Sequence, residues 1–504
     1  MKNLKIYFTS DLHGYVYPTD YITKTEKNIG LLNIINQYKK DGNTLIIDAG
    51  DIIQGSPFTN YLSGYKFDKH PIADVMNTGG YDYVTLGNHD FNYGYDYLYK
   101  YISNLNAKCL CTNVVDHTKK IDILPYDIKT MENGLKVGVI GVTTDYINIW
   151  ERKEHLSNFT VSDTYSSLTP FCNKVKNEVD ILIGIYHGGF ESDIDSHIQL
   201  SKTSENIAYK ICQDFDFDIL LTGHQHMEIG GQYLHNTYIA QTPHNGSKFV
   251  ELNLSFNEGR VKNINSTLVD VVINPNKEMY DKYMYLEELV QDWLDTPVGF
   301  LDKDLHPSDH IDMALNGSPL ANFINQIQLD KSGAHIACTS FANVVKGFNK
   351  DVSVRDIMST YPYPNTLIIL QVNRDILKLA LERCASYFTI DNGNVEVSDA
   401  FLKPKVEHYN YDYFANIDYT FDLTKNVGSR VTSIKYDGVE LDEYINLSLV
   451  MNNYRASGAG GYEFYQDCKI LKEILSEMPD IIIDYFRNNK NVIVDDSKYI
   501  TTIY

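Results

Sequence analysis

Five short polar clusters in the first half of the chain contain residues that could bind metal ions. They are DLHG (11–14), GD (50–51), GNHD (87–90), HG (187–188) and GHQH (223–226). The candidate ligands are Asp11, His13, Asp51, Asn88, His187, His224 and His226. Oxygen and imidazole ligands without thiolate suit borderline divalent metals such as Mn, Zn, Fe or Co, and they argue against a closed structural zinc site. Seven ligands exceed the needs of one tetrahedral ion and suit two ions that share a carboxylate. Two such metals clamp a phosphate and generate a nucleophile from water.

Each cluster follows a run of apolar and β-branched residues that predicts a buried strand. Strands are expected at 5–10, 43–50, 82–87, 136–144, 180–188 and 218–223, with helices at 29–40, 70–80 and 204–215. This alternation predicts an α/β layered domain, closed by further strands between about 232 and 273. Ligand sites in such sheets form beyond the carboxyl ends of the strands. An isolated Asp or His after a strand is usually a turn or cap residue, but five clusters together predict one site on one sheet edge.

The second half of the chain predicts a further α/β region after a connecting helix. The polar stretch 274–295 has helical spacing of its large side chains and ends just before Pro297. Strands are expected at 334–340, 365–373, 419–424 and 444–453, and helices at 319–331, 374–388 and 470–489. We therefore place the domains at 1–273 and 298–504, with the helix at 274–297 between them.

Composition limits the partners. A chain of 504 residues is too long for one core, and its 43% hydrophobic and 22% charged residues are ordinary for a globular protein. The formal net charge is −22, without a dense basic cluster, so we expect no nucleic-acid partner. The N-terminus lacks a signal-peptide apolar region and no run approaches a membrane span, which predicts a cytoplasmic protein that needs no membrane. Seven scattered cysteines predict reduced, mostly buried thiols, and the oligomeric state is left open.

The ordered series D-x-H, G-D, G-N-H-D, H-G and G-H-x-H resembles the calcineurin-like metallophosphoesterases over roughly residues 1–270. That resemblance implies an N-terminal domain of layered αββα architecture. It assigns Asp11, His13 and His226 to one metal, and Asn88, His187 and His224 to the other, with Asp51 bridging. On this assignment His224 and His226 reach different ions. His89, paired with Asp90, resembles the catalytic dyad of that family, and its imidazole would stabilise transition-state charge or protonate the leaving oxygen.

Three later stretches resemble the C-terminal domain of the 5′-nucleotidase family: 316–325 (NGSPLANFIN), 361–367 (YPYPNTL) and 452–462 (NNYRASGAGGY). The family's C-terminal domain is α/β and holds the nucleoside by stacking its base between two aromatic side chains, a contact that is strong yet tolerant of base identity. The resemblance assigns one stacking position to Tyr454, with Asn453 beside it. Tyr411 is our choice for the other, with Tyr413 and Phe414 as neighbouring alternatives.

Departures from the 5′-nucleotidase pattern favour one branch of the family. The arginine of an Asn-Gly-Gly-x-Arg-like turn is missing from 334–347, and Gly460 stands where 5′-nucleotidases usually place Asp. These stretches, with 401–414, look more like the 2′,3′-cyclic-nucleotide 2′-phosphodiesterase/3′-nucleotidase branch. We therefore expect a two-metal phosphoesterase that converts 2′,3′-cyclic nucleotides to 3′-nucleotides and then to nucleosides. The alternatives are a 5′-nucleotidase or nucleotide-sugar hydrolase, and a catalytically silent binding protein on the same fold.

Overall fold

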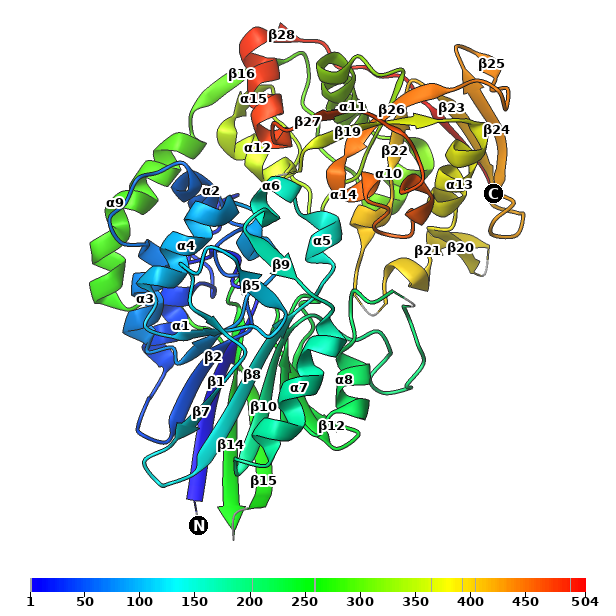
Figure 1. The fold of residues 1–504 in the computed structure, drawn as a ribbon. Coiled ribbons are helices and arrows are strands. Elements are labelled where there is room, and N and C mark those ends of the chain that lie inside the picture. The colour runs from blue at the N-terminus through cyan, green and yellow to red at the C-terminus, as the bar shows by residue number, and fades with distance from the viewer. Residues whose placement is uncertain are drawn as a thin grey trace. The chain divides into compact units, whose positions relative to one another are not determined.

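The computed structural model describes residues 2–201, 203–257, 260–363, 365–391, 393–403, 405–489 and 491–504. These residues form two compact units, Met1–Val290 and Gln291–Tyr504. The division falls within helix α9 (Lys277–Leu294), which occupies most of the predicted connecting helix. Figure 1 shows the order of the elements in each unit.

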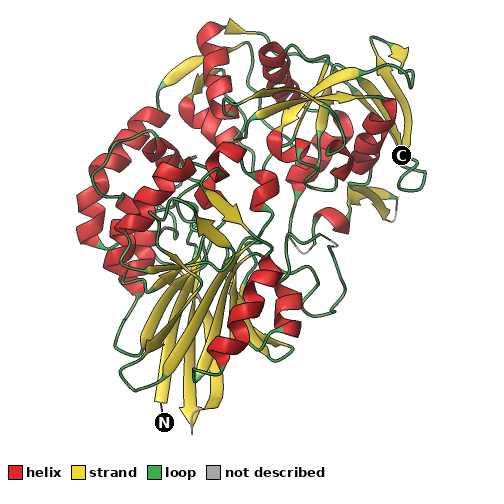
Figure 2. Ribbon diagram, viewed as in Figure 1, coloured by secondary structure: helices red, strands yellow, loops and turns green. Residues whose placement is uncertain are grey.

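Unit 1 contains two mixed β-sheets that pack face to face (Figure 2). The seven-stranded sheet has the order β15-β14-β1-β2-β3-β4-β6, and the six-stranded sheet has the order β12-β13-β11-β10-β8-β7. Their strands are β1 (Lys2–Thr9), β2 (Thr44–Asp48), β3 (Tyr83–Val84), β4 (Lys108–Leu110), β6 (Ile123–Leu124), β7 (Tyr126–Thr130), β8 (Lys136–Thr143), β10 (Ile181–His187), β11 (Ile219–Thr222), β12 (Ile229–Leu234), β13 (Thr237–Gln241), β14 (Lys248–Asn257) and β15 (Arg260–Asp270). Apolar side chains of both sheets, including Phe8, Ile47, Ile183 and Leu221, share one buried core.

Helices cover the outer faces of both sheets. On the six-stranded sheet, α7 (Thr164–Lys176) and α8 (Ala208–Asp214) bury Leu168 and Ile211 in a second apolar cluster. Helices α1 (Leu31–Gln37), α3 (Pro71–Gly79) and α4 (Gly94–Asn104) lie outside the seven-stranded sheet (Figure 1). Shorter elements are α2 (Pro57–Ser63), η1 (His89–Phe91), β5 (Val114–Asp116), α5 (Ile147–Trp150), α6 (Lys153–Leu156) and β9 (Phe159–Val161). The predicted αββα layering is confirmed.

The polar clusters follow strands of both sheets, so the expected single sheet edge is wrong. Strands β1, β2 and β3 are parallel neighbours in the seven-stranded sheet, and β8, β10 and β11 are parallel neighbours in the six-stranded sheet. The carboxyl ends of the two sets meet, as a hydrogen bond between the His187 ring and the Ala49 carbonyl oxygen shows. Apolar periodicity predicts each strand but contains no information on which sheet the strand joins.

Unit 2 is built mainly on two sheets, with the strand orders β22-β17-β26-β19-β27 and β25-β24-β23-β29. Its strands are β16 (Pro297–Leu301), β17 (Ile336–Thr339), β18 (Asp351–Ser353), β19 (Leu367–Val372), β20 (Phe388–Asp391), β21 (Asn394–Val397), β22 (Tyr413–Ala415), β23 (Asp418–Asp422), β24 (Val431–Tyr436), β25 (Val439–Glu440), β26 (Leu447–Asn452), β27 (Ile470–Ile474), β28 (Asn491–Val492) and β29 (Ile500–Ile503). Its helices are α10 (His310–Asn316), α11 (Pro319–Ser332), α12 (Val354–Thr360), α13 (Arg374–Ala385), α14 (Asn453–Ala456) and α15 (Met478–Asn488), with 3-10 turns η2 (Asp399–Phe401), η3 (His408–Asn410) and η4 (Glu463–Tyr465).

The helix predicted at 470–489 is wrong in its first part. Residues Ile470–Ile474 form the edge strand β27, which pairs antiparallel with β19. The helix begins only at Met478, and Pro479 occupies its first turn, where a missing N–H costs nothing. Alternating apolar and charged residues in this stretch satisfy either period, and pairing with β19 decides for the strand.

Two further observations concern the whole chain. All seven cysteines are free, and six of them are buried, as their scattered positions predicted. Among the residues that the structure describes, no helix is both long enough and apolar enough to cross a membrane.

Candidate metal centre and active site

The loops after the strands turn back sharply at the candidate ligands themselves. Asp11, His13, Asp51, His224 and His226 all have positive φ angles, between 47° and 70°. This left-handed conformation is unfavourable for residues with a Cβ atom, and it concentrates at functional sites. Backbone hydrogen bonds hold the first loop in place: the amides of Asp11 and His13 donate to the carbonyl oxygens of Gly50 and Asp51 in the loop after β2, at 2.9 and 2.8 Å. Each turn therefore directs a polar side chain back over the strand ends.

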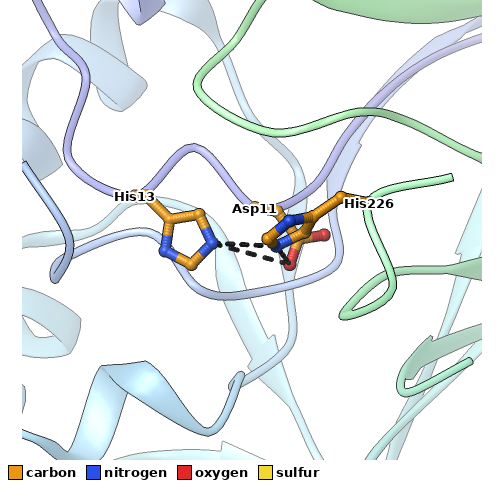
Figure 3. A group of neighbouring side chains, drawn as sticks. All are labelled: Asp11, His13 and His226. Atoms are coloured by element: carbon orange, nitrogen blue, oxygen red, sulfur yellow. Dashed lines mark hydrogen bonds and ion pairs between the residues drawn. The ribbon is translucent and has the colours of Figure 1, made fainter. Parts of the chain in front are cut away.

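The first group of ligand atoms belongs to Asp11, His13 and His226, whose side chains converge in Figure 3. The Nε2 atoms of the two histidines are 3.1 Å apart, and Nε2 of His226 is 3.4 Å from a carboxylate oxygen of Asp11. Nδ1 of His13 faces the carbonyl oxygen of Gln54 at 3.1 Å, which places the ring hydrogen on Nδ1. The lone pair on Nε2 is therefore left for a metal.

The second group contains Asp51, His187 and His224, with Asn88 between them. The Asn88 carbonyl oxygen is 3.1 Å from Nε2 of His187 and 3.0 Å from Nδ1 of His224. Nε2 of His187 is also 3.2 Å from the Asp51 carboxylate. The opposite nitrogen of His187 donates to the Ala49 carbonyl oxygen at 2.7 Å, so this ring too presents Nε2 to the group.

Electrostatics set the protonation states of these groups. Burial alone would raise the pKa of Asp51, but the neighbouring imidazoles, His187 first among them, hold it well below its usual range. Burial would lower the pKa of His187, yet the carboxylate of Asp51 outweighs burial and raises it to about 10. Burial, aided by His226 and His89 and opposed by Asp51, lowers the pKa of His13 to about 3. An ionised Asp51 and a neutral His13 are the forms that metal ligation requires, whereas the proton that Asp51 holds on Nε2 of His187 would be released when a metal binds.

Two glycines let the loops approach closely enough to form the second group. A Cβ on Gly87 would lie 2.1 Å from the Asp51 carboxylate, and a Cβ on Gly50 would lie 2.4 Å from the Gly87 amide nitrogen. Gly50 also has a φ of 93°, which side chains rarely allow. The glycines of the GD and GNHD clusters are therefore required by the close contact of the two loops.

The donor set fits divalent metal ions. The structure brings together all seven predicted ligands in two adjacent groups, and within each group of His and Asp residues the ligand atoms lie within 4.8 Å of one another. His224 and His226 belong to different groups, because each follows its own left-handed turn. Convergent carboxylate, amide and imidazole atoms are donor types that suit borderline divalent metal ions.

Sequence reasoning missed two residues that hold His224. Nε2 of His224 faces a carboxylate oxygen of Glu205 at 3.0 Å, which directs Nδ1 towards the second group. The indole of Trp150 stacks on the same imidazole, with ring centroids 5.4 Å apart and an interplanar angle of 20°. Neither residue belongs to a strand-end cluster, so nothing in the local pattern marks them.

The predicted pairing of His89 with Asp90 is wrong. Asp90 is 1% exposed, and its carboxylate accepts four backbone N–H groups, from Asp51, Ile52, Ile53 and Gly87, at 2.8–3.1 Å. Burial and the charge of Asp51 raise the pKa of Asp90 to about 6 despite these bonds. Asp90 thus fastens the two ligand loops together.

The ring of His89 instead bonds to Asn92, whose Oδ1 is 2.7 Å from Nδ1. His89 begins a 3-10 turn, in which side chains at i and i+3 lie on the same side, whereas those at i and i+1 diverge. The spacing of His89 and Asn92 could have indicated this pair. The His89 ring lies beside that of His13, with centroids 5.4 Å apart, so it borders the first ligand group.

In unit 2, Tyr411 is not available for stacking. It is 2% exposed, donates to the Ala314 carbonyl oxygen at 3.0 Å and packs against Tyr387 and Tyr413. The alternatives Tyr413 and Phe414 are also buried, at 6% and 2% exposure. The sequence choice is wrong because this stretch of the chain faces the core.

Tyr454 and Tyr409 are both partly exposed and both contact Arg455. The Arg455 guanidinium donates to the Tyr409 carbonyl oxygen at 2.9 Å and lies 5.9 Å from the Tyr454 ring centroid. Arg455 itself is 1% exposed and is paired with Asp412 at 2.8 Å. The side-chain oxygen of Asn453 accepts the Thr366 amide at 3.0 Å and so fixes the turn that carries Tyr454.

Both units of the chain match known protein families. The model of the calcineurin-like phosphoesterases matches residues 4–228, and that of the 5′-nucleotidase C-terminal domain matches residues 297–467. A crystal structure of a candidate 5′-nucleotidase from Staphylococcus aureus, in complex with alpha-ketoglutarate, is 33% identical over 100% of both chains, with a TM-score of 0.92. The chain belongs to the 5′-nucleotidase family.

Curated members of the 5′-nucleotidase family are more distant. The trifunctional nucleotide phosphoesterase YfkN of Bacillus subtilis is 26% identical over 97% of this chain, which spans 38% of that protein. The 2′,3′-cyclic-nucleotide 2′-phosphodiesterase/3′-nucleotidase of Haemophilus influenzae is 24% identical over 96% of this chain and 84% of that protein. The family's calcineurin-like domain implies divalent metal ions, in agreement with the donor set of unit 1.

Proposed function

We propose that this protein is a two-metal phosphoesterase that hydrolyses 2′,3′-cyclic nucleotides to 3′-nucleotides and then to nucleosides. The convergence of seven ligands in two adjacent groups supports the phosphoesterase activity. The substrate is supported by the missing arginine turn, by Gly460 and by the name of the Haemophilus influenzae relative.

Asp11, His13 and His226 would hold one ion, and Asn88, His187 and His224 the other, with Asp51 shared. Bound metals supply neutralisation of phosphate charge and activation of water. The protein contributes the placement of the ligands, through Asp90 and the glycines of the two loops, and its backbone carbonyl groups leave Nε2 of His13 and of His187 facing the ligand groups.

His89 would act on the leaving group. Its ring borders the first ligand group, and Asn92 keeps a hydrogen on Nδ1, so Nε2 is the nitrogen that exchanges a proton with substrate. As the bond from phosphorus to the sugar oxygen breaks, protonated Nε2 donates its proton to that oxygen, which leaves as a neutral hydroxyl. General acids of this kind contribute about 10²–10⁴-fold in rate.

Unit 2 would recognise the nucleoside. Tyr454 keeps the stacking position that the sequence resemblance assigns, and Tyr409 replaces Tyr411 as the second aromatic residue, because it is partly exposed and its backbone is bonded to Arg455. Stacking contributes about 1–3 kcal/mol per base and tolerates different bases.

Parallel assays of 2′,3′-cyclic AMP, 3′-AMP and 5′-AMP with Mn²⁺ test the substrate. We expect 2′,3′-cyclic AMP and 3′-AMP to be hydrolysed with higher kcat/KM than 5′-AMP. A preference for 5′-AMP would favour the alternative of a 5′-nucleotidase, which the name of the Staphylococcus aureus relative supports.

Two variants test the assigned sites. Asp51→Asn should lower the metal content below two ions per chain, measured by elemental analysis, and should nearly abolish hydrolysis; retention of both ions with full activity would refute the shared ligand. Tyr454→Ala should raise KM for nucleotides about 10-fold or more, as expected from the loss of one stacking contact. An equal rise in KM for a small phosphodiester that has neither a base nor an aromatic ring would exclude the stacking role.

A further inference from the structure

A chain of hydrogen bonds continues behind the ring of His89. Oδ1 of Asn92 is 2.7 Å from Nδ1 of His89, and Nδ2 of Asn92 donates to Oε2 of Glu151 at 2.6 Å. The other oxygen of Glu151 accepts the Arg152 amide at 2.7 Å and faces Nδ1 of His155 at 2.9 Å. Glu151 thus connects a short helical segment to the residue that would protonate the leaving group.

The direction of these bonds follows from the chemistry of the groups. An ionised carboxylate only accepts hydrogen bonds, so Glu151 requires the amide of Asn92 to present its NH₂ group. The carbonyl oxygen of Asn92 must then face His89, and the imidazole must carry a hydrogen on Nδ1. An asparagine without this constraint can turn its amide by 180° and present NH₂ to Nδ1, which selects the opposite tautomer.

The segment that carries Glu151 is held firmly. The Glu151 side chain is 5% exposed, and its backbone amide donates to the Ile147 carbonyl oxygen at 2.9 Å. Asn148 donates its side-chain NH₂ to the Val161 carbonyl oxygen at 3.0 Å. Trp150, immediately before Glu151, stacks on the candidate ligand His224. One rigid turn therefore supports both a metal ligand and the partner of His89.

We propose that Glu151 is a positioning residue, which fixes the tautomer of His89 by orienting the amide of Asn92. The proposal rests on the proposed function, because it needs His89 to protonate the leaving oxygen through Nε2. The carboxylate of Glu151, acting through Asn92, thereby orients His89 as an aspartate in direct contact with the histidine would do.

The test uses leaving groups of different basicity. Glu151→Gln replaces an acceptor by an amide that can either accept or donate, so the amide of Asn92 loses its fixed orientation. Hydrolysis of 3′-AMP, whose leaving oxygen needs a proton, should lose about 10-fold or more in kcat with KM unchanged. Hydrolysis of p-nitrophenyl phosphate, whose leaving group departs as an anion, should change less than about twofold. Substituted phenyl phosphates should show a steeper dependence of rate on leaving-group pKa.

A charge exchange provides the rescue. In the double variant Asn92→Asp with Glu151→Gln, the carboxylate introduced in place of the Asn92 amide would accept from His89 and from the introduced glutamine. Hydrolysis of 3′-AMP should therefore return to within about threefold of wild type. Glu154→Gln, at an exposed position of the same segment, is the matched control for the loss of one charge and should leave all rates unchanged. Metal content and Tm should be the same in every variant.

Equal losses with both leaving groups, or no loss with 3′-AMP in Glu151→Gln, would overturn the proposal. His89→Ala separates this failure from failure of the proposed function. If His89→Ala is defective with 3′-AMP while Glu151→Gln is not, only the role of Glu151 is refuted. If His89→Ala is fully active, the assignment of His89 as the acid is refuted as well.

Discussion

Arg455 offers a sharp test of how unit 2 is held together. Its guanidinium is 1% exposed, pairs with Asp412 at 2.8 Å and lies 4.0 Å from the Tyr462 ring centroid. It also donates to the carbonyl oxygens of Tyr409 and Ala459. The substitution Arg455→Met keeps much of the apolar volume and removes every one of these polar contacts.

The expected loss is large because the substitution leaves a buried charge behind. Removal of one partner from a buried ion pair costs about 3–5 kcal/mol. Burial already raises the pKa of Asp412 against the opposing effect of Arg455, so without Arg455 this carboxyl would be protonated at higher pH. A loss of this size is a large part of the roughly 5–15 kcal/mol that stabilises a typical domain.

The two tryptophans of the chain make the measurement specific. Trp150 lies in unit 1 and Trp293 in unit 2, so in a Trp150→Phe background urea unfolding followed by fluorescence reports on unit 2. The double variant Asp412→Leu with Arg455→Met should be less destabilised than the sum of the single variants, because no charge is stranded. A cost below about 1 kcal/mol for Arg455→Met, or strict additivity, would refute the reasoning.

Arg455→Met should also affect substrate binding. The carbonyl of Tyr409 loses its donor and the ring of Tyr454 loses its neighbouring cation, so KM for nucleotides should rise at temperatures where unit 2 remains folded. KM for a small phosphodiester without an aromatic ring is the control and should not change. A rise in both values would show that the substitution acts on the metal centre and not on nucleoside recognition.

Two other predictions concern unit 1. Asp90→Asn should leave two buried backbone N–H groups facing an amide NH₂. Each unsatisfied N–H group costs about 1–3 kcal/mol of stability, partly offset by relief of the repulsion from Asp51, so Tm and metal content should fall together. A fully stable, metal-loaded but inactive variant would instead support a catalytic role for Asp90. His70 is fully buried, and within the described chain neither ring nitrogen has a hydrogen-bond partner. Burial, with the charge of Lys100, lowers the pKa of His70 to about 3. As pH falls below about 6.5, His70 becomes protonated in the unfolded state but stays neutral in the folded state. His70 alone therefore lowers the free energy of unfolding by about 2 kcal/mol between about pH 7 and pH 5. His70→Phe should abolish that part of the acid sensitivity in urea unfolding, and an unchanged pH dependence would exclude it.

Local sequence pattern was sufficient to locate the strands and the candidate ligand residues that follow them. Each candidate ligand lies within a few residues of a buried apolar run, so its position at a strand end could be predicted. The ordered series of clusters also predicted that His187 and Asp51 belong to the same site, and the two side chains are neighbours in the structure. The assignment of β1 and β10 to different sheets could not be predicted, because each strand contains a buried apolar run and such a run does not specify which sheet it joins.

Residues that orient a candidate ligand or the partner of His89 from another segment could not be predicted from local sequence pattern. Glu151 lies 59 residues from Asn92 and Glu205 lies 19 residues from His224, and only the folded backbone brings each pair together. Tyr409 and Tyr411 are two residues apart with identical chemistry, so only burial tells them apart. By contrast, the partner of His89 could have been found from a local rule, the i and i+3 spacing of a 3-10 turn, although we paired His89 with Asp90 from the sequence.

At five candidate ligand residues, the side chain needed for metal binding occupies a left-handed backbone conformation that residues with a Cβ atom disfavour. Asp11, His13, Asp51, His224 and His226 occupy backbone positions that favour glycine, at roughly 1 kcal/mol each or more. Together this is about 5 kcal/mol, a magnitude close to the net stability of a small domain. Substitution of these residues by glycine would relieve the unfavourable backbone conformation and would remove the candidate metal ligands. A lineage that is no longer selected for hydrolysis should therefore lose these ligand residues quickly and gain thermal stability. An inactive relative with glycine at these turns should have the higher Tm.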